Sequence, residues 1–374
     1  MTEAATGTTT VGTGRRLPGP DVVRAVALIG VVVMNYHGYL ILRDSTDLRS
    51  GWLEELFDPW SGPLSTRFAA TFVLVAGVGV TLMTASAADR ARRDPDDEVA
   101  RRSLTAVRWR LVRRGVALYV FGLLLDEIWR GTIIPYYGLM FVLAAGLFTW
   151  RSRWVIVAGL GAALAGAALA WWRFERRTDG ASTRWLTQPD EGSLRDHVFG
   201  VTVNGTHPLL PWFAFFCAGI VVGRVLRTPW WRSAVTAVGL TLVAVAAVAS
   251  KAPTTDLADV LLSIDPFERG LVYVTSALGT ALLAYAGIDW LANRFPAGTD
   301  PLRRAGQMTL TLYVLHVLVF NLVVDWLGWV DPARIAVALA VSLGFWAAGI
   351  AAAVAWNRRF GMGPAERVYR ALGG

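Results

Sequence analysis

The sequence predicts an all-α polytopic membrane protein with about ten transmembrane helices and both termini in the cytoplasm. Of the 374 residues, 54% are hydrophobic, and the mean hydropathy is +0.45. Charged residues make up 17% of the chain, whereas a soluble domain carries about 25%. The apolar residues stand in long blocks rather than in an amphipathic pattern, which places the chain in the membrane class.

Ten apolar blocks approach the length of about 20 residues that a helix needs to cross the hydrocarbon core. They lie at residues 22–42, 64–86, 110–126, 133–149, 154–172, 207–226, 232–250, 268–292, 305–327 and 335–356. No low-complexity linker divides them, so we expect residues 18–360 to form a single transmembrane domain. We expect residues 1–17 to be a disordered cytoplasmic segment and residues 361–374 to be a cytoplasmic tail.

The arginines between the blocks predict the orientation of the chain. They gather before the first block, in every even-numbered loop and after the last block, and the second loop alone reads "DRARRDPDDEVARRSLTAVRWRLVRR". The first odd-numbered loop is acidic, with Glu54, Glu55 and Asp58. Positively charged loops stay in the cytoplasm. With ten spans, every arginine-rich loop and both termini lie on the cytoplasmic side. We therefore expect a multi-pass protein of the cell membrane. The net charge of +8 comes from these arginines, whose positions between the blocks set the orientation of the chain. No nucleic-acid partner is therefore expected.

Polar residues interrupt the outer halves of three blocks. The stretch "VVVMNYHGYL" places Asn35 and His37 in the first block, with His37 about 22 Å from its start. His207 opens the sixth block and His316 lies in the ninth. Ionisable residues inside a membrane usually serve a function, although each histidine could instead donate a hydrogen bond to a neighbouring helix. Without a short-range ligand pair we expect no metal site.

A cluster of arginines begins the third block, in the stretch "RWRLVRRG". Arg110 and Arg114 are four residues apart and therefore share a helix face. A role in keeping this end of the helix in the cytoplasm is enough to explain the cluster. A basic face at the membrane boundary also suits a polyanion such as a nucleotide phosphate.

Several motifs of the chain resemble those of one group of membrane enzymes. "GPDVVRAVALIGVVVMNYHG" resembles the opening "DxxRGxAxxxMxxxN" motif of the heparan-α-glucosaminide N-acetyltransferase catalytic family and its bacterial YeiB-like relatives. "GTIIPYYGLMFVLAA" and "HPLLPWFAFFCAGIVVGR" are similar to YeiB-like segments, and "GQMTLTLYVLHVLVFNL" resembles the late "GxxxLxxYxxH" helix of both groups. The motifs follow the expected order along most of the chain.

The resemblance implies a transmembrane acyltransferase that takes an acyl group from cytoplasmic acyl-CoA and delivers it to an acceptor outside. Asp21 and Arg24 match the opening motif, and Tyr313 and His316 match the late motif. The chain departs from the heparan-type enzymes in the outer loop after the first span, "LRDSTDLRSGWLEELFDPW", which has no histidine. His37 is similar to the histidine of the wider acyltransferase-3 group, at a spacing from Asp21 two residues longer.

Acyl transfer needs a base and a hydrogen-bond donor for the oxyanion. We expect His37 to be the base, with Asn35 or His316 orienting it or supporting the oxyanion. The expected donor and acceptor sites involve the following residues: Arg24, Arg110, Arg113 and Arg114 for acyl-CoA, and Arg67, Tyr136, Tyr137, His207, Glu268 and Arg269 for the acceptor. The tyrosines could equally be an interfacial belt.

Acyl-CoA, with acetyl-CoA as the first choice, is expected as a donor substrate, and no permanently bound cofactor is expected. The expected partners are the lipid bilayer and an extracytoplasmic sugar, glycan or lipid-linked headgroup, and a homodimer is compatible with the pattern. A transporter or flippase for a polar or lipid-linked solute is a second hypothesis, because intramembrane polar residues and glycine-rich helices suit it too. A non-catalytic scaffold is a third, although it leaves the shared height of the histidines unexplained.

Overall fold

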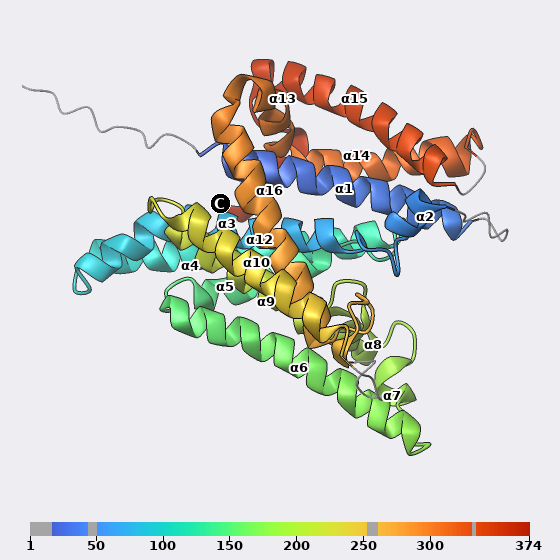
Figure 1. The fold of residues 1–374 in the computed structure, drawn as a ribbon. Helices are drawn as coiled ribbons and strands as arrows, with labels where there is room; N and C mark the ends of the chain where they lie inside the picture. The colour runs from blue at the N-terminus through green and yellow to red at the C-terminus, as the bar shows by residue number, and fades with distance from the viewer. Residues whose placement is uncertain (1–16, 44–50, 253–260, 331–333) are drawn as a thin grey trace, which may run out of the picture.

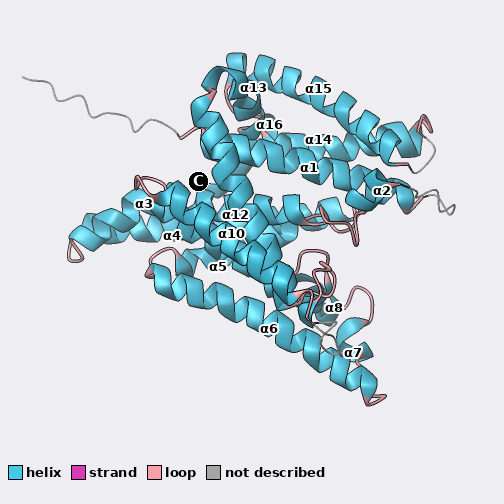
Figure 2. Ribbon diagram, in the orientation of Figure 1, coloured by secondary structure: helices cyan, strands magenta, loops and turns pink. Residues whose placement is uncertain are grey.

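The computed structural model describes residues 17–43, 51–252, 261–330 and 334–374. These residues form helices and loops, with no β-strand among them (Figure 2). The long helices are α1 (Gly19–Ile41), α3 (Arg67–Arg93), α4 (Glu98–Asp126), α5 (Ile134–Leu147), α6 (Ser152–Thr178), α9 (Leu209–Val225), α10 (Trp231–Ala249), α12 (Leu271–Arg294), α14 (Thr309–Phe320) with the π-helix η2 (Asn321–Trp326), and α15 (Ile335–Phe360). The shorter helices are α2 (Trp52–Leu56), α7 (Arg184–Thr187), α8 (Leu194–Phe199), the π-helix η1 (Gly200–Asn204), α13 (Pro296–Gly306) and α16 (Pro364–Gly373).

The prediction of a polytopic helical membrane protein is confirmed, but the count of ten spans is not. Seven described helices are long and apolar enough to cross a membrane, and the bent pair of helices Leu194–Asn204 and Leu209–Val225 would make eight. Helix α4 carries the arginine cluster around its middle, and the 14 residues of α5 cover only about 21 Å of a core about 30 Å thick. The predicted disordered segment, residues 1–17, lies almost entirely outside the described residues.

Helix α1 lies inside the bundle, in contact with α3, α12, α13, α14 and α15 (Figure 1). Glycines let the helices approach closely, as small residues do in membrane bundles. A Cβ atom at Gly77 of α3 would collide with the backbone of α9, and a Cβ atom at Gly219 of α9 would collide with the backbone of α3. Helix α6 contacts α9 and lies at the opposite edge of the bundle from α15 in Figure 1.

Contacts between helices define two opposite ends of the bundle, one of them rich in arginine. At the arginine-rich end, the Gln307 amide donates to Asp21 over 3.2 Å, and Arg304 donates to Asn357 over 2.9 Å. The segment 361–374, expected as a tail, contains α16, which packs against α4 and α14. At the other end, the carboxylate of Glu54 accepts a hydrogen bond from the backbone of Ile335. We call these the inner and the outer end.

The segment 173–206 has a sequence compatible with a lid, a short interfacial helix or a connector. In the structure it is largely helical, with α6 continuing to Thr178 and with α7, α8 and η1 following. The helical pair around residues 205–208 is bent by 52°. This break places residues 206 and 207 beside the outer part of α1, where the site described below is found.

Candidate active site

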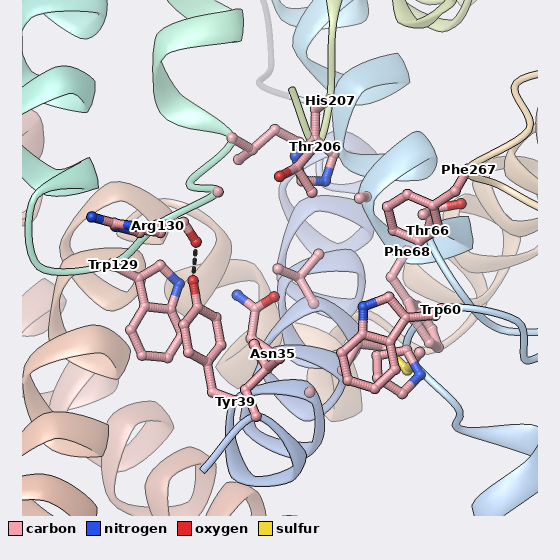
Figure 3. Close-up of a pocket in the computed structure, with 18 of the residues that line it drawn as sticks. Asn35, Tyr39, Trp60, Thr66, Phe68, Trp129, Arg130, Thr206, His207 and Phe267 are labelled. Carbon is pink, nitrogen blue, oxygen red and sulfur yellow. Dashed lines mark hydrogen bonds between the residues drawn. The ribbon is translucent and has the colours of Figure 1, made fainter. Parts of the chain in front are cut away.

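A cavity of about 240 Å³ lies in the outer half of the bundle. It is enclosed by α1, the segment joining α2 to α3, the turn between α4 and α5, and α14. In Figure 3, Thr206 and His207 lie on one side of the cavity, and Asn35 and Tyr39 lie on the other. The remaining wall is mainly aromatic and includes Trp60, Phe68, Trp129, Phe267 and Tyr313, together with Thr66 and Arg130.

One face of α1 forms the floor of the cavity. Its lining residues are Val31, Met34, Asn35, Gly38, Tyr39 and Leu42, a spacing of three and four that defines a single helix face. Successive helical residues are rotated by about 100° from one another. Asn35 therefore faces the cavity, whereas the neighbouring Tyr36 and His37 face other helices.

Asn35 is held by His316. The amide nitrogen of Asn35 lies 3.3 Å from Nε2 of His316, and Nδ1 of His316 contacts the carbonyl oxygen of Tyr313. A ring nitrogen that faces a carbonyl oxygen must carry a hydrogen, so in the neutral ring Nε2 accepts the hydrogen bond from Asn35. His316 is fully buried and does not line the cavity. It therefore supports the cavity wall from behind, through Asn35 and through ring contacts with Trp129 and Tyr313.

His207 is the only one of the four histidines that lines this cavity, and all four lie within the described residues. Its ring packs edge to face against Trp212, with centroids 4.6 Å apart, and against Tyr136 at 5.9 Å. Its Nδ1 atom is buried and has no hydrogen-bond partner among the described residues. The ring is thus positioned by aromatic contacts, and its Nδ1 atom is not engaged by any described residue.

The backbone just before His207 is held by Arg269. The Arg269 guanidinium donates hydrogen bonds to the carbonyl oxygens of Val203, of Asn204 over 3.1 Å and of Gly205 over 2.6 Å. Gly205 packs so closely against the Tyr136 hydroxyl that a Cβ atom there would collide with it. Two residues expected to bind the acceptor, Arg269 and Tyr136, therefore position the segment that carries His207.

The other residues expected at the acceptor site lie outside this wall. The Arg67 guanidinium is 5.4 Å from the ring centre of Tyr273 and donates to the Tyr273 carbonyl over 3.5 Å. Tyr137 is buried against Phe72, with ring centroids 5.6 Å apart. Glu268 is exposed, next to Phe267. Their acceptor-binding roles remain predictions.

His37 is enclosed by polar partners of its own. Its Nε2 atom lies 2.9 Å from the Glu54 carboxylate, and its Nδ1 atom lies 2.9 Å from the Phe57 carbonyl oxygen. Nδ1 must carry a hydrogen to face a carbonyl, whereas Nε2 and Oε2 of Glu54 lie at ion-pair distance without forming a hydrogen bond in the described structure. Both ring nitrogens thus face protein groups, and His37 does not line the cavity. The base role of His37 stays a prediction, and this geometry favours a role in packing.

A second cavity, of about 490 Å³, adjoins the first and shares Arg130, Gly131 and Thr206 with it. Its wall carries four acidic residues, Asp126, Glu127, Glu191 and Asp196, together with His197 and Tyr136. Among the described residues, no group of three or more His, Cys, Asp or Glu side chains could hold a metal ion.

The predicted donor residues lie at the inner end. Arg24 of α1 forms an ion pair with Asp21 at 3.6 Å and donates to the Gly306 carbonyl over 3.5 Å. Arg113 of α4 is exposed. Arg24 and Arg114 both act on Tyr369 of α16, so the start of α1 and the middle of α4 lie at the same end of the bundle.

Arg110 and Arg114 have buried nitrogens that lack partners. The Nε atoms of both residues are without a hydrogen bond in the part of the chain that the structure describes. Arg114 contacts the sulfur of Met83 through Nη1, and its guanidinium carbon lies 5.5 Å from the ring centre of Tyr369 on α16. The positive charge of Arg110 is close enough to repel that of Arg114. This arrangement leaves cationic groups available to an anion.

The sequence of the chain matches two known protein families. The heparan-alpha-glucosaminide N-acetyltransferase catalytic family matches residues 16–253, which is more than half of the chain. The chain belongs to this family. A second family, described as a protein of unknown function (DUF418), matches residues 213–373. No curated protein matches the chain. The resemblance inferred from the motifs is confirmed, and it gives the chain a membrane acetyltransferase-like function.

The cavity draws on both matched segments. The part matched by the heparan-alpha-glucosaminide N-acetyltransferase catalytic family supplies Asn35, the turn around Trp129 and His207, whereas Phe267 and Tyr313 come from the later segment. The two segments overlap at residues 213–253, which include most of α9 and all of α10. Residues of both segments therefore line the cavity.

Sequence reasoning missed several residues that line the cavity. Tyr39 stacks on Trp129 with ring centroids 3.8 Å apart, and the Tyr39 hydroxyl contacts the Arg130 carbonyl (Figure 3). Tyr39 is four residues after Asn35, so the helix face through Asn35 could have identified it. Trp60 and Thr66 lie in irregular segments, where no periodic pattern indicates orientation.

Proposed function

We propose that the protein transfers an acyl group, most simply acetyl, from cytoplasmic acyl-CoA to a hydroxyl or amine of an extracytoplasmic acceptor. The observation that carries this proposal is the outer cavity, where His207, with an unpartnered ring nitrogen, lies across from Asn35. The arginines at the inner end supply the complementary donor site. A location in the cell membrane, with the outer end facing away from the cytoplasm, follows from the positive-inside rule.

The donor's phosphates would bind at Arg24, Arg110 and Arg114. Arginine suits this purpose because its planar guanidinium forms paired hydrogen bonds with phosphate oxygens. Eleven residues of α1 separate Arg24 from Asn35, a rise of about 16 Å. The extended pantetheine arm of CoA is long enough to carry a thioester over such a distance. The thioester would then reach the cavity floor while the nucleotide remains at the inner end.

Within the cavity, His207 is the base of the proposed reaction. Its imidazole accepts the proton of the acceptor's O–H or N–H group, and the oxygen or nitrogen then attacks the thioester carbonyl. The remaining N–H of the Asn35 amide donates to the oxyanion that forms, while His316 fixes the amide. When the intermediate collapses, the carbon–sulfur bond breaks and the protonated His207 returns its proton to the departing thiolate. The products are the acylated acceptor and CoA.

A transporter or flippase remains the second candidate. The bent helical pair that places His207 at the cavity is the kind of discontinuous helix that lines transporter binding sites. Dependence on the donor separates the two functions, because a transporter moves its solute without consuming acyl-CoA.

The test uses purified protein in liposomes whose orientation has been determined. Acetyl-CoA carrying a labelled acetyl group is supplied on the inner face, with glucosamine or glucose on the outer face. The proposal predicts saturable acetyl-CoA binding and labelled acceptor in the outer compartment, and the amine of glucosamine distinguishes N-transfer from O-transfer to glucose. Absence of acetyl-CoA binding, or passage of sugar without label, would contradict the proposal.

A further inference from the structure

Helix α16 is anchored firmly at the inner end. The Glu366 carboxylate accepts hydrogen bonds from the backbone N–H groups of Leu310 over 2.7 Å and of Thr311 over 3.2 Å, and from the Thr311 hydroxyl over 2.6 Å. A carboxylate is favoured there because the first N–H groups of α14 have no partner within their own helix. Residues 366, 369 and 373 share the face of α16 that this anchor turns toward the bundle.

That face brings Tyr369 against the donor arginines. The Arg114 guanidinium lies over the Tyr369 ring at 5.5 Å, and the backbone of Gly373 packs against the Arg114 side chain. The Tyr369 hydroxyl is buried and has no hydrogen-bond partner among the described residues. The positive charges of both Arg114 and Arg24 reach this hydroxyl. An O–H group buried without a partner is unfavourable, and most such groups in proteins are satisfied by a partner.

The charges that act most directly on Arg114 are positive. Arg110 and Arg370 both act on Arg114 as like charges. Within the described ranges, neither Arg110, Arg114 nor Arg370 forms an ion pair with a carboxylate. Arg370 is exposed, so the cluster extends from the surface to the buried hydroxyl. Like charges held together without a counter-charge favour the binding of an anion.

We propose that α16 completes the donor site and that Tyr369 is a donor-binding residue whose hydroxyl donates a hydrogen bond to a phosphate of CoA. This inference rests on the proposed function, which places acyl-CoA at the inner end. It adds to the donor site a side chain from α16, a different helix from the one that carries the arginine cluster. It also supplies a partner for the buried Tyr369 hydroxyl, which has none among the described residues.

The test replaces Tyr369 by phenylalanine, which keeps the ring and its position beside Arg114. Acetyl-CoA binding is measured on the purified full chain, with acetyl-pantetheine, which lacks the phosphates, as the second probe. Removal of a hydrogen bond to a charged group predicts an affinity for acetyl-CoA about ten- to a hundredfold lower. Acetyl-pantetheine affinity and the melting temperature should stay unchanged. Tyr119→Phe removes a hydroxyl from α4, the helix that carries Arg114, and should leave both affinities unaltered.

The outcomes separate this inference from the proposed function. Wild-type affinity for acetyl-CoA in Tyr369→Phe, with reduced affinity in Arg110→Ala, would overturn the role of Tyr369 and leave the donor site intact. An equal decrease for both probes would mean that the substitution disturbs the fold, and it would also overturn the inference. If the wild-type protein binds no acetyl-CoA, the proposed function and this inference fail together.

Discussion

The Nε2 atom of His37 lies 2.9 Å from the carboxylate of Glu54, and both side chains are buried. The other carboxylate oxygen of Glu54 accepts a hydrogen bond from the backbone of Ile335 over 2.8 Å. This pair therefore ties α1 and α2 to the start of α15. The intramembrane histidine that first attracts attention in the sequence is occupied by a structural contact.

We expect His37→Ala to destabilise the protein by about 3–5 kcal/mol, because it leaves the Glu54 carboxylate buried without its partner. The melting temperature in detergent measures this effect. The contrasting variant is His37→Gln, which keeps a donor for Glu54 and should retain most of the transfer activity. Loss of transfer in a His37→Gln protein with the wild-type melting temperature would restore His37 as the candidate base.

At the inner end, we expect Arg110→Ala combined with Arg114→Ala to weaken acyl-CoA binding. Each hydrogen bond to a phosphate that the double variant can no longer form should cost about 1.5–3 kcal/mol of binding free energy. Arg153→Ala removes an exposed arginine near the start of α6, at the same end, and is the control. Calorimetric titration with acetyl-CoA distinguishes the variants, and the difference should shrink as salt is added. Equal affinity in the double variant and the control would mean that the cluster only sets topology.

Arg269→Ala tests whether the segment before His207 must be fixed. Without the hydrogen bonds to the carbonyls of residues 203–205, the transfer rate should fall by about tenfold to a hundredfold, because small misplacements of a catalytic group are costly. Donor affinity should not change, since Arg269 lies at the outer end. Arg195→Ala, at an exposed position of the same outer region, should transfer at the wild-type rate. A normal rate in Arg269→Ala would show that the aromatic contacts of His207 suffice.

The orientation can be checked by labelling introduced cysteines. Arg195 and Thr105 are exposed, and Cys217, the only natural cysteine, is buried. In intact cells, Arg195→Cys should react with a membrane-impermeant thiol reagent and Thr105→Cys should react only after permeabilisation. The reverse pattern would invert the topology and exchange the donor and acceptor sides.

The helical bundle was predictable because apolar blocks and arginine-rich loops are local features of a sequence. The partner of His37 was not, because Glu54 reaches it only when α2 folds back onto α1. Asn35 and His316 were expected to assist His37, but they contact each other instead, because they lie at similar heights on neighbouring helices. The position of His207 depends on the bend before α9 and on the Arg269 hydrogen bonds, which no periodic pattern records.

The acyl-transfer rate of His207→Gln at saturating acetyl-CoA is the most direct test of the proposed mechanism. Glutamine keeps a polar side chain of similar reach but cannot take up a proton, so the rate should fall by about 10² to 10⁴. Acetyl-CoA affinity and the melting temperature should remain those of the wild type, and His197→Gln, which changes an exposed histidine of the adjoining cavity, should transfer normally. A His207→Gln protein that transfers at the wild-type rate would contradict the assignment of the base and, with it, the outer cavity as the site of acyl transfer.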